Sequence, residues 1–213
     1  MAEQLSNDVK ISIIIPTIGN PMTVQYINSE KLKENNIELI IVEDKGWRNA
    51  SRTRNIGAAI AKGDILCFID DDVEFDFDEF LNIIRETEKE IDNAFYCTVN
   101  PHILIVKRDI FLKIGGYDER YPIYGAEDVE IRERLKKYGL QFRTVDIKLR
   151  HFWDNKRRLI ANKCFTWTYV TYGTYPLRKI LFRKNPIEFA RRIIWLMEWM
   201  LIKRWQKRSI FYN

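Results

Sequence analysis

Residues 54–72 read RNIGAAIAKGDILCFIDDD, and this stretch decides the fold. Its first half has helical spacing and ends near Gly63, a residue type that commonly lies just past the last turn of a helix. Residues 65–69 are mostly apolar, as expected for a strand that is buried on both faces of a parallel sheet. Three aspartates, residues 70–72, follow directly. The stretch therefore predicts a helix, a buried strand and an acidic turn at the carboxyl end of that strand.

The residues before this stretch show the same alternation of strand and helix. Residues 11–16 (ISIIIP) and 37–42 (IELIIV) are apolar and β-branched, and residues 22–35 between them predict a helix. This alternation indicates right-handed βαβ units, so we predict an α/β fold with a mostly parallel, Rossmann-like sheet flanked by helices. Ligands bind such sheets beyond the carboxyl ends of the strands. Three turns occupy those positions: residues 16–19, 43–45 and 70–72.

Further elements are predicted after the acidic turn. Asp76 is a suitable N-cap for the next helix, with Glu79 three residues later. The expected elements are a helix at 77–93, strands near 95–99 and 103–106, a helix at 126–138 and a strand at 141–147.

The charge distribution divides the chain into two parts. Residues 156–213 contain 14 Lys and Arg but only two acids, a local charge of +12, whereas the net charge of the 213-residue chain is +5. We therefore expect a catalytic domain at residues 1–155 and a basic, aromatic, helical extension at 156–213 that meets an anionic surface. No secretory leader follows Met1, and the three cysteines are widely spaced, so we expect a cytoplasmic location.

The acidic turn predicts a metal site. Adjacent carboxylates repel one another unless a cation compensates them. Asp70 and Asp72 offer hard oxygen ligands two residues apart, which suit a divalent ion such as Mn²⁺ or Mg²⁺. The alternative is a solvated turn with an Asp helix cap, but the position at the end of a central strand favours the metal site.

The quoted stretch resembles the signature of family 2 glycosyltransferases, which have the GT-A fold. There, Arg-Asn-x-Gly opens a helix, Ala-x-Gly-Asp closes it, and a strand ends in an Asp-x-Asp-type motif. The first two strand regions, ISIIIPTIGN and ELIIVEDKG, are also similar to that family, and the matching segments extend through residues 10–151. The resemblance implies an inverting transfer of sugar from a nucleotide-diphosphate donor.

The resemblance also implies roles for residues at the three turns. Asp72 would be the main metal ligand, and Asp70 and Asp71 would contact the ribose or the metal. The pocket for the nucleotide base would be formed by Pro16, Thr17 and Asp44.

Three arginines lie at the start of the helix that leads into the acidic turn. Backbone N–H groups at a helix start already favour anions, so at least one diphosphate contact is expected from Arg48 or Arg54. Arg54 would face the diphosphate or brace the acidic motif, whereas Arg52 is expected to be solvated. The sequence does not choose which arginine binds the diphosphate.

Residues 115–139, GGYDERYPIYGAEDVEIRERLKKYG, contain a second pair of carboxylates. On a helical wheel, Glu127 and Asp128 point toward the apolar side of the predicted helix, where burial would raise the pKa of a carboxyl group. Acids in the first turn also complement the helix dipole, which is the structural alternative. The stretch resembles the family's acceptor-site motif, which implies that Asp128 is the general base and that Glu127 orients the acceptor.

The two histidines are treated differently. By the resemblance, His151 completes the metal shell, although a lone histidine is more often structural. His102 has no such argument and is expected to be structural.

The C-terminal segment contains an apolar run, IIWLMEWMLI, that is too short to span a bilayer. An aliphatic arc lies on one side of the predicted helix, and Trp195 and Trp199 lie on the other among basic residues. The helix either packs on the body or lies at an anionic membrane surface with its Trp rings at headgroup depth. The mixture of aromatic and basic residues at 167–179 favours the membrane, and with it a lipid-linked or surface glycan as the hydroxyl acceptor.

Two other functions are consistent with parts of the sequence. A sugar-phosphate nucleotidyltransferase would carry a Gly-rich, basic loop after the first strand, but that loop reads TIGNPM here. A non-catalytic module could bind nucleic acid through its basic, Trp-rich tail, but no nucleic-acid-binding motif supports it.

Overall fold

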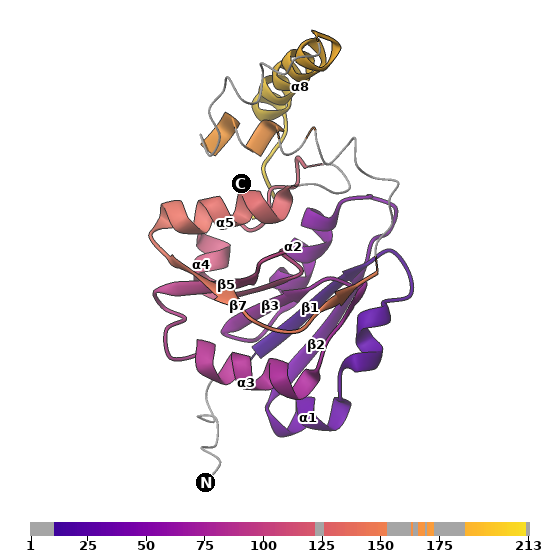
Figure 1. The fold of residues 1–213 in the computed structure, drawn as a ribbon, viewed down its shortest axis with the longest axis vertical. Coiled ribbons are helices and arrows are strands. Elements are labelled where there is room, and N and C mark those ends of the chain that lie inside the picture. The colour runs from indigo at the N-terminus through magenta and orange to yellow at the C-terminus, as the bar shows by residue number, and fades with distance from the viewer. Residues whose placement is uncertain are drawn as a thin grey trace.

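The computed structural model is built around a six-stranded sheet with the strand order β2-β1-β3-β6-β5-β7 (Figure 1). The structure describes residues 11–121, 126–152, 163, 166–168, 170–172 and 186–211. The strands are β1 (Ile11–Thr17), β2 (Ile37–Glu43), β3 (Ile65–Ile69), β5 (Ala94–Thr98), β6 (Ile103–Lys107) and β7 (Gln141–Val145).

Five of these strands run in one direction and β6 runs in the other. β1 is parallel to β2 and β3, β6 is antiparallel to both β3 and β5, and β5 is parallel to β7. The sheet is therefore mostly parallel, as predicted. The carboxyl ends of β1, β2 and β3 meet at one edge, and β6 begins at that same edge.

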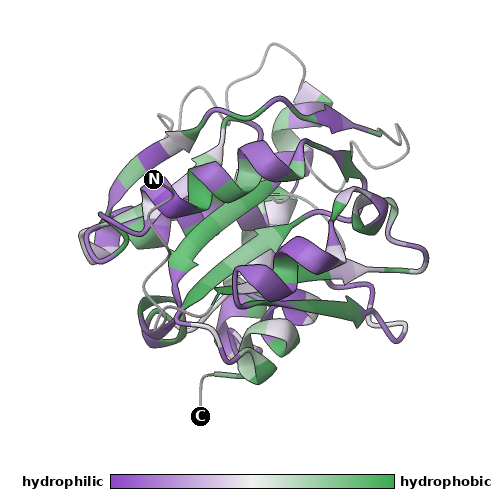
Figure 2. Ribbon diagram, turned by 90° about the horizontal axis from the view of Figure 1, so that it is seen from below, coloured by the Kyte–Doolittle hydropathy of each residue, from purple (hydrophilic) through white to green (hydrophobic). Residues whose placement is uncertain are grey.

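Helices cover both faces of the sheet because the side chains of each central strand alternate between the faces. On one face, Ile13 and Cys67 pack with α1 (Ser29–Glu34) and α3 (Phe77–Thr87). The other face is covered by α2 (Ala50–Ile60), α4 (Arg108–Lys113) and α5 (Glu127–Tyr138). Figure 2 shows apolar central strands between helices whose outer surfaces are hydrophilic. Burial on both faces explains the continuous apolar runs of the central strands.

Two predicted helices are shorter than expected. The region predicted as one helix at 22–35 contains a 3₁₀ helix, Met22–Tyr26, and α1. Asn28 separates them, because its side chain accepts hydrogen bonds from the N–H groups of Glu30 and Lys31 and so begins a new helix. The helix predicted at 77–93 ends at Thr87, although its predicted cap is confirmed: Asp76 accepts from the N–H groups of Asp78 and Glu79.

A second, two-stranded sheet brings distant parts of the chain together beside the acidic turn. β4 (Val73–Glu74) pairs in antiparallel fashion with β8 (Arg150–His151), and Val73 lies opposite His151. The backbone N–H of Phe152 donates to the carbonyl of Asp72 over 3.0 Å. These contacts fix the end of the body against the acidic turn.

The C-terminal helix α8 (Pro186–Trp205) lies at one end of the molecule, beyond α5 (Figure 1). Trp195 and Trp199 of this helix are buried: Trp199 stacks on Trp167 with ring centroids 4.7 Å apart, and the Trp167 indole N–H donates to the carbonyl of Trp195. Tyr121 packs edge-on against both Trp167 and Trp199. No helix among the described residues is long and apolar enough to cross a membrane.

The end of the chain returns to the body after α8. Arg208 donates to the buried carboxylate of Glu130 over 2.9 Å, and its carbonyl accepts from the N–H of Glu119. The Ser209 hydroxyl donates to the carbonyl of Gly115. The basic extension is thus attached to the region around the start of α5.

Gly57 provides a test of the packing of α2 on the sheet. A Cβ at Gly57 would lie 2.4 Å from Cγ2 of buried Ile14, so Gly57→Ala should lower the free energy of unfolding by about 1–3 kcal/mol through overpacking. Gly19→Ala is the matched control, because a Cβ at Gly19 would meet nothing within 4 Å. Urea denaturation of both variants measures the difference. Equal stability of the two variants would contradict this account of the packing.

Candidate functional site

Residues after three neighbouring strands form the candidate site at one edge of the sheet. Pro16 and Thr17 end β1, and both are buried. Asp44 follows β2 directly, and its backbone N–H donates to the carbonyl of Thr17 over 2.7 Å. The three aspartates follow β3, which is the other neighbour of β1. The structure therefore brings together the predicted base-binding residues and the acidic turn.

The carboxylate of Asp44 is held by the turn that leads into α2. Its two oxygens accept from the backbone N–H groups of Arg48, over 3.0 Å, and Asn49, over 2.8 Å. Burial alone would raise the pKa of Asp44, but these backbone hydrogen bonds outweigh burial and lower the pKa below its usual value. Asp44 is therefore ionised and fixed in orientation, as a residue that binds a polar ligand group needs to be.

Thr23 fixes the backbone of the acidic turn. Its hydroxyl donates to the carbonyl of Asp70, at 2.7 Å, and accepts from the N–H of Val73, at 3.0 Å. Its own N–H donates to the carbonyl of Asp71. Because Thr23 is fully buried, these bonds hold the turn in one conformation.

Both carboxylate oxygens of Asp70 are already engaged within the protein. Oδ1 accepts from the guanidinium of Arg54 over 2.7 Å, and Oδ2 lies 3.0 Å from Nδ1 of His102. Burial alone would raise the pKa of Asp70, but the hydrogen bond with His102 and the charge of Arg54 hold it below its usual value. Asp70 therefore holds Arg54 and His102 in position within the site.

The pKa values of Asp71 and Asp72 are shifted upward, in the opposite direction to that of Asp70. Burial raises the pKa of Asp71, neighbouring aspartates add to the shift, and a hydrogen bond with Thr17 opposes it. Burial and the charge of Asp70 also raise the pKa of Asp72. The carboxylates repel one another, so a cation bound beside Asp72 would relieve a cost that the protein itself leaves partly uncompensated.

Asp72 and His151 form a pair that is suited to a divalent ion. Nε2 of His151 lies 3.1 Å from Oδ2 of Asp72. Two adjacent ligands of an octahedral ion, each about 2.1 Å from the metal, lie about 3 Å apart, so both atoms could bind one ion without moving far. No three His, Cys, Asp or Glu side chains form a complete metal centre within the described part of the chain. The pair therefore fits a metal whose other ligands are phosphate oxygens and water, which is how Mg²⁺-type sites are commonly completed.

His102, for which only a structural role was expected, lies inside this site. Besides its contact with Asp70, its ring stacks on that of His151 with centroids 4.2 Å apart. The sequence contained a signal for this position. Only four residues separate β5 from β6, a connection that allows an antiparallel hairpin but not a parallel crossover. An antiparallel β6 must begin at the edge where β5 ends, so His102, just before β6, lies at that edge.

Arg54 connects the acidic turn to the second pair of carboxylates. Its guanidinium, 6% exposed, donates to Asp70 over 2.7 Å and to Glu127 over 3.3 Å, and lies 3.8 Å from Asp128. Burial raises the pKa of Asp128 well above the usual carboxyl range, Arg54 opposes the shift, and Glu127 adds to it. The structure therefore brings Glu127 and Asp128 into the same site as the acidic turn. Arg54 braces both groups, the second of the two roles expected for it.

The other two arginines differ from Arg54 in their exposure to solvent. Arg48 and Arg52 are exposed, and the guanidinium of Arg52 lies 4.8 Å from the centroid of the Trp47 ring. Arg48 has a positive φ of 50°, which places its N–H on Asp44. Of the two arginines considered for the diphosphate, Arg48 is thus the one whose side chain is not committed to buried carboxylates.

Asn55 and Gly57, two more residues of the stretch that decides the fold, have structural roles. The Asn55 side chain accepts from the N–H of Tyr117 over 2.8 Å and donates to the Tyr117 carbonyl over 2.9 Å. It also donates to Glu119, which accepts from the N–H of Ile210. In Arg-Asn-x-Gly, the arginine therefore binds the carboxylates, the asparagine holds the loop before α5, and the glycine packs on the sheet.

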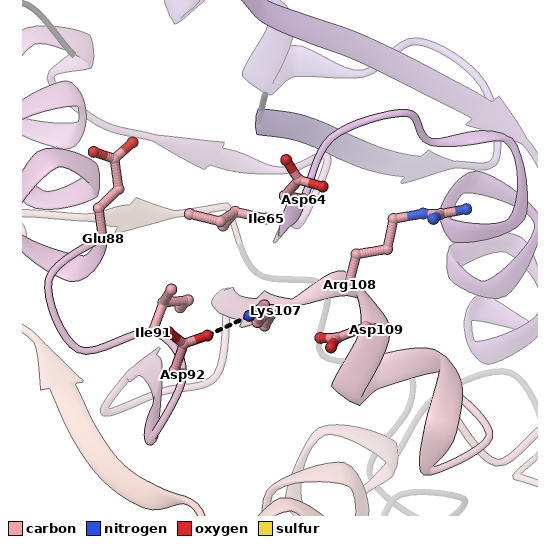
Figure 3. Close-up of a pocket in the computed structure, with 8 residues that line it drawn as sticks. All are labelled: Asp64, Ile65, Glu88, Ile91, Asp92, Lys107, Arg108 and Asp109. Carbon is pink, nitrogen blue, oxygen red and sulfur yellow. Dashed lines mark hydrogen bonds and ion pairs between the residues drawn. The ribbon is translucent and has the colours of Figure 1, made fainter. Parts of the chain in front are cut away.

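A separate pocket lies at the opposite edge of the sheet (Figure 3). It has a volume of about 450 Å³, and its lining includes Asp64, which precedes β3, and Lys107, which ends β6 and pairs with Asp92. Since β3 separates Asp64 from Asp70, this pocket is distinct from the candidate site.

Replacing Arg54 tests its role as the shared cation. Arg54→Met should lower the free energy of unfolding near neutral pH by about 3–5 kcal/mol, because it leaves buried carboxylates unpaired. In the wild type the lowered pKa of Asp70 stabilises the fold above the unfolded pKa of about 3.9, and this contribution is lost as the pH falls through the folded pKa. In the variant the unpaired carboxylates destabilise the fold only when ionised.

The difference in stability between wild type and Arg54→Met should therefore shrink as the pH falls toward about 4. Urea denaturation at both pH values measures it. Arg52→Met is the control, since Arg52 is exposed. A loss of stability that is equal at both pH values would show that Arg54 acts through packing alone.

Comparisons with known proteins bear on the fold and on one part of the sequence. A family model described as the N-terminal domain of galactosyltransferase matches residues 93–157, which include the start of α5 and His151 but cover less than half of the chain. No curated protein matches the sequence significantly. The resemblance to family 2 in particular stays a prediction.

Solved structures of glycosyltransferases share the fold. The Drosophila β1,4-galactosyltransferase 7, solved with manganese, UDP-Gal and xylobiose, is 18% identical with a TM-score of 0.54, over 70% of this chain and 73% of that one. The mannosyltransferase PcManGT of Pyrobaculum calidifontis, solved with GDP-Man and Mn²⁺, is 12% identical with a TM-score of 0.59, over 92% and 71% of the two chains. GalNAc-T7, solved with UDP, GalNAc and Mn²⁺, is 13% identical with a TM-score of 0.56, over 77% and 48%. What these proteins share with this chain at such identities is the architecture: the chain has a GT-A-type fold.

Proposed function

We propose that the protein is a glycosyltransferase that moves a sugar from a nucleoside-diphosphate donor to a hydroxyl acceptor with inversion. One observation carries the proposal: Arg54 joins the acidic turn after β3 to the carboxylates at the start of α5. A donor site and an acceptor site built from segments far apart in sequence thus meet at a single buried cation. The likeness to solved enzymes with bound UDP and GDP sugars supports the same function.

The donor would bind at the carboxyl ends of β1, β2 and β3. Asp44, ionised and held by two backbone N–H groups, would accept hydrogen bonds from the nucleotide base, whose pocket Pro16 and Thr17 would line. Asp71 would contact the ribose, and the exposed Arg48 would reach the diphosphate. The donor would be a UDP-sugar or a GDP-sugar.

The residues beside the diphosphate fit a divalent ion. Asp72 and His151 would hold it, and Asp70, bound to Arg54 and His102, would position the turn rather than contribute a free oxygen. The nitrogen ligand favours Mn²⁺ over Mg²⁺, which takes oxygen ligands. Such an ion would stabilise the negative charge that develops on the departing diphosphate.

Asp128 would act as the general base on the acceptor. Its raised pKa makes it a stronger base than an ordinary carboxylate, and the charge of Arg54 opposes the shift and favours the ionised form. Asp128 would take the proton of the acceptor hydroxyl, and the oxygen would attack the anomeric carbon as the bond to the diphosphate breaks. A single displacement inverts that carbon. Glu127, 6% exposed and bound to Arg54, would orient the acceptor and Asp128.

An already anionic acceptor such as a lipid phosphate would make a general base largely unnecessary. The half-buried Asp128 with its raised pKa therefore favours a sugar hydroxyl, carried on a lipid-linked or surface glycan. Transfer to a lipid phosphate that survives Asp128→Ala would contradict this choice.

Asp128→Asn should reduce transfer by at least about 100-fold, because a general base typically contributes about 10²–10⁴-fold to the rate. The same change should leave nucleotide binding nearly intact, since Asp128 lies on the acceptor side of Arg54. Glu133→Gln is the matched control: Glu133 lies on the same helix and its side chain is 20% exposed, against 21% for Asp128. Product formation from a panel of nucleotide sugars measures both variants, and wild-type turnover by Asp128→Asn would refute the assignment.

Asp72→Asn and His151→Ala should each abolish the Mn²⁺-dependent part of stabilisation by a nucleoside diphosphate. For the wild type we expect about 2.7 kcal/mol of stabilisation at a hundredfold excess over the dissociation constant. Thermal unfolding with UDP or GDP, with and without Mn²⁺, provides the measurement. Arg150→Ala, at the exposed neighbour of His151, should behave as wild type. Full Mn²⁺-dependent stabilisation of both site variants would place the metal elsewhere.

A further inference from the structure

The two sides of α8 have opposite roles in the structure. Trp195 and Trp199 are 9% and 4% exposed and face the body. The indole N–H of Trp199 donates to Thr171 over 3.1 Å, and the guanidinium of Arg120 lies over its ring. The tryptophans therefore anchor the helix to the protein, and they are not at the outer surface where the membrane interpretation placed them.

The opposite side of α8 exposes large aliphatic side chains. Ile194, Met197, Met200 and Leu201 are 62%, 57%, 63% and 60% exposed. They recur at intervals of three or four residues, so they lie side by side on one face of the helix. We call these four residues the aliphatic stripe. A continuous, exposed apolar face of this kind on a helix indicates an interaction surface for another protein, a ligand or a membrane.

The charge of the C-terminal segment that contains α8 indicates an anionic partner. Residues 156–213 carry a net charge of +12. Both acids of α8 are occupied: Glu188 pairs with Arg191, and Glu198 pairs with Lys163. Arg204, three residues after Leu201 and therefore on the same side of the helix, is exposed, and so is Lys207 just beyond the helix. The helix thus combines an exposed aliphatic face with basic residues and no unpaired acid of its own.

We propose that the aliphatic stripe of α8 docks onto an anionic lipid surface, with the helix lying along the interface. The stripe would enter the boundary between headgroups and acyl chains, and the basic side chains would contact anionic headgroups. This proposal concerns a surface separate from the candidate site and does not depend on the proposed function.

Two other occupants fit the observations less well. A second copy of this chain would bring two segments of charge +12 together at the stripe, which is unfavourable. Nucleic acid would match the charge, but single strands bind by stacking on aromatic rings, and Trp167, Trp195 and Trp199 are buried. Aliphatic side chains on the exposed face match lipid rather than bases.

Flotation of the full chain with vesicles tests the proposal. The wild type should float with vesicles that contain phosphatidylglycerol and much less with vesicles of phosphatidylcholine alone. Met197→Glu combined with Leu201→Glu should reduce the floated fraction at least tenfold. Ile60→Glu is the matched control, because Ile60 is also 60% exposed but lies on α2, and it should float like the wild type.

Three results would overturn the proposal. The first is equal flotation of the double variant and the wild type. The second is a wild type that is dimeric by light scattering and a double variant that is monomeric, with flotation unchanged, which would assign the stripe to self-association. The third is equal loss of flotation in Ile60→Glu. Thermal unfolding with UDP or GDP serves as a separate readout: the double variant should keep the wild-type nucleotide response, so loss of flotation is distinguished from failure of the donor site or of folding.

Discussion

The buried guanidinium of Arg54 is the interaction on which the arrangement of the site depends. Asp70 belongs to the end of β3, and Glu127 and Asp128 belong to the start of α5, so their carboxylates approach only because one cation lies between them. This arrangement also divides the acidic turn. Both carboxylate oxygens of Asp70 bind side chains within the protein, namely those of Arg54 and His102. The carboxylate of Asp72 lies beside His151, where a ligand could bind.

The C-terminal segment also stabilises this site, through contacts with the loop before α5 and with α5 itself. Glu119, in the loop before α5, is held by Asn55 on one side and by the chain beyond α8 on the other. Arg208 binds Glu130, which also accepts two hydrogen bonds from Arg134. The first half of α5 and the helix that carries the aliphatic stripe are therefore linked through buried contacts. Docking of α8 on a membrane would hold the site close to a lipid-borne acceptor.

The sequence predicted those features that depend on local pattern. Burial on both faces gives β3 its apolar run, the strand end places the aspartates at the ligand-binding edge, and the Asp76 cap starts α3 as expected. Features that depend on distant partners were not predictable. The pairing of Arg54 with Glu127 spans 73 residues, and the burial of Trp199 depends on Trp167, which no periodicity reveals. His102 is a different case: the short connection before β6 indicates the reversed direction of that strand, so its place could have been predicted from the sequence.

Electron spin echo spectroscopy of bound Mn²⁺ tests the central claim most directly, because it detects nitrogen ligands of the metal. With UDP or GDP present, the account predicts coupling to one imidazole nitrogen that disappears in His151→Ala and persists in His102→Ala. It would be contradicted by a spectrum without imidazole coupling, or by coupling that is lost with His102 and kept without His151.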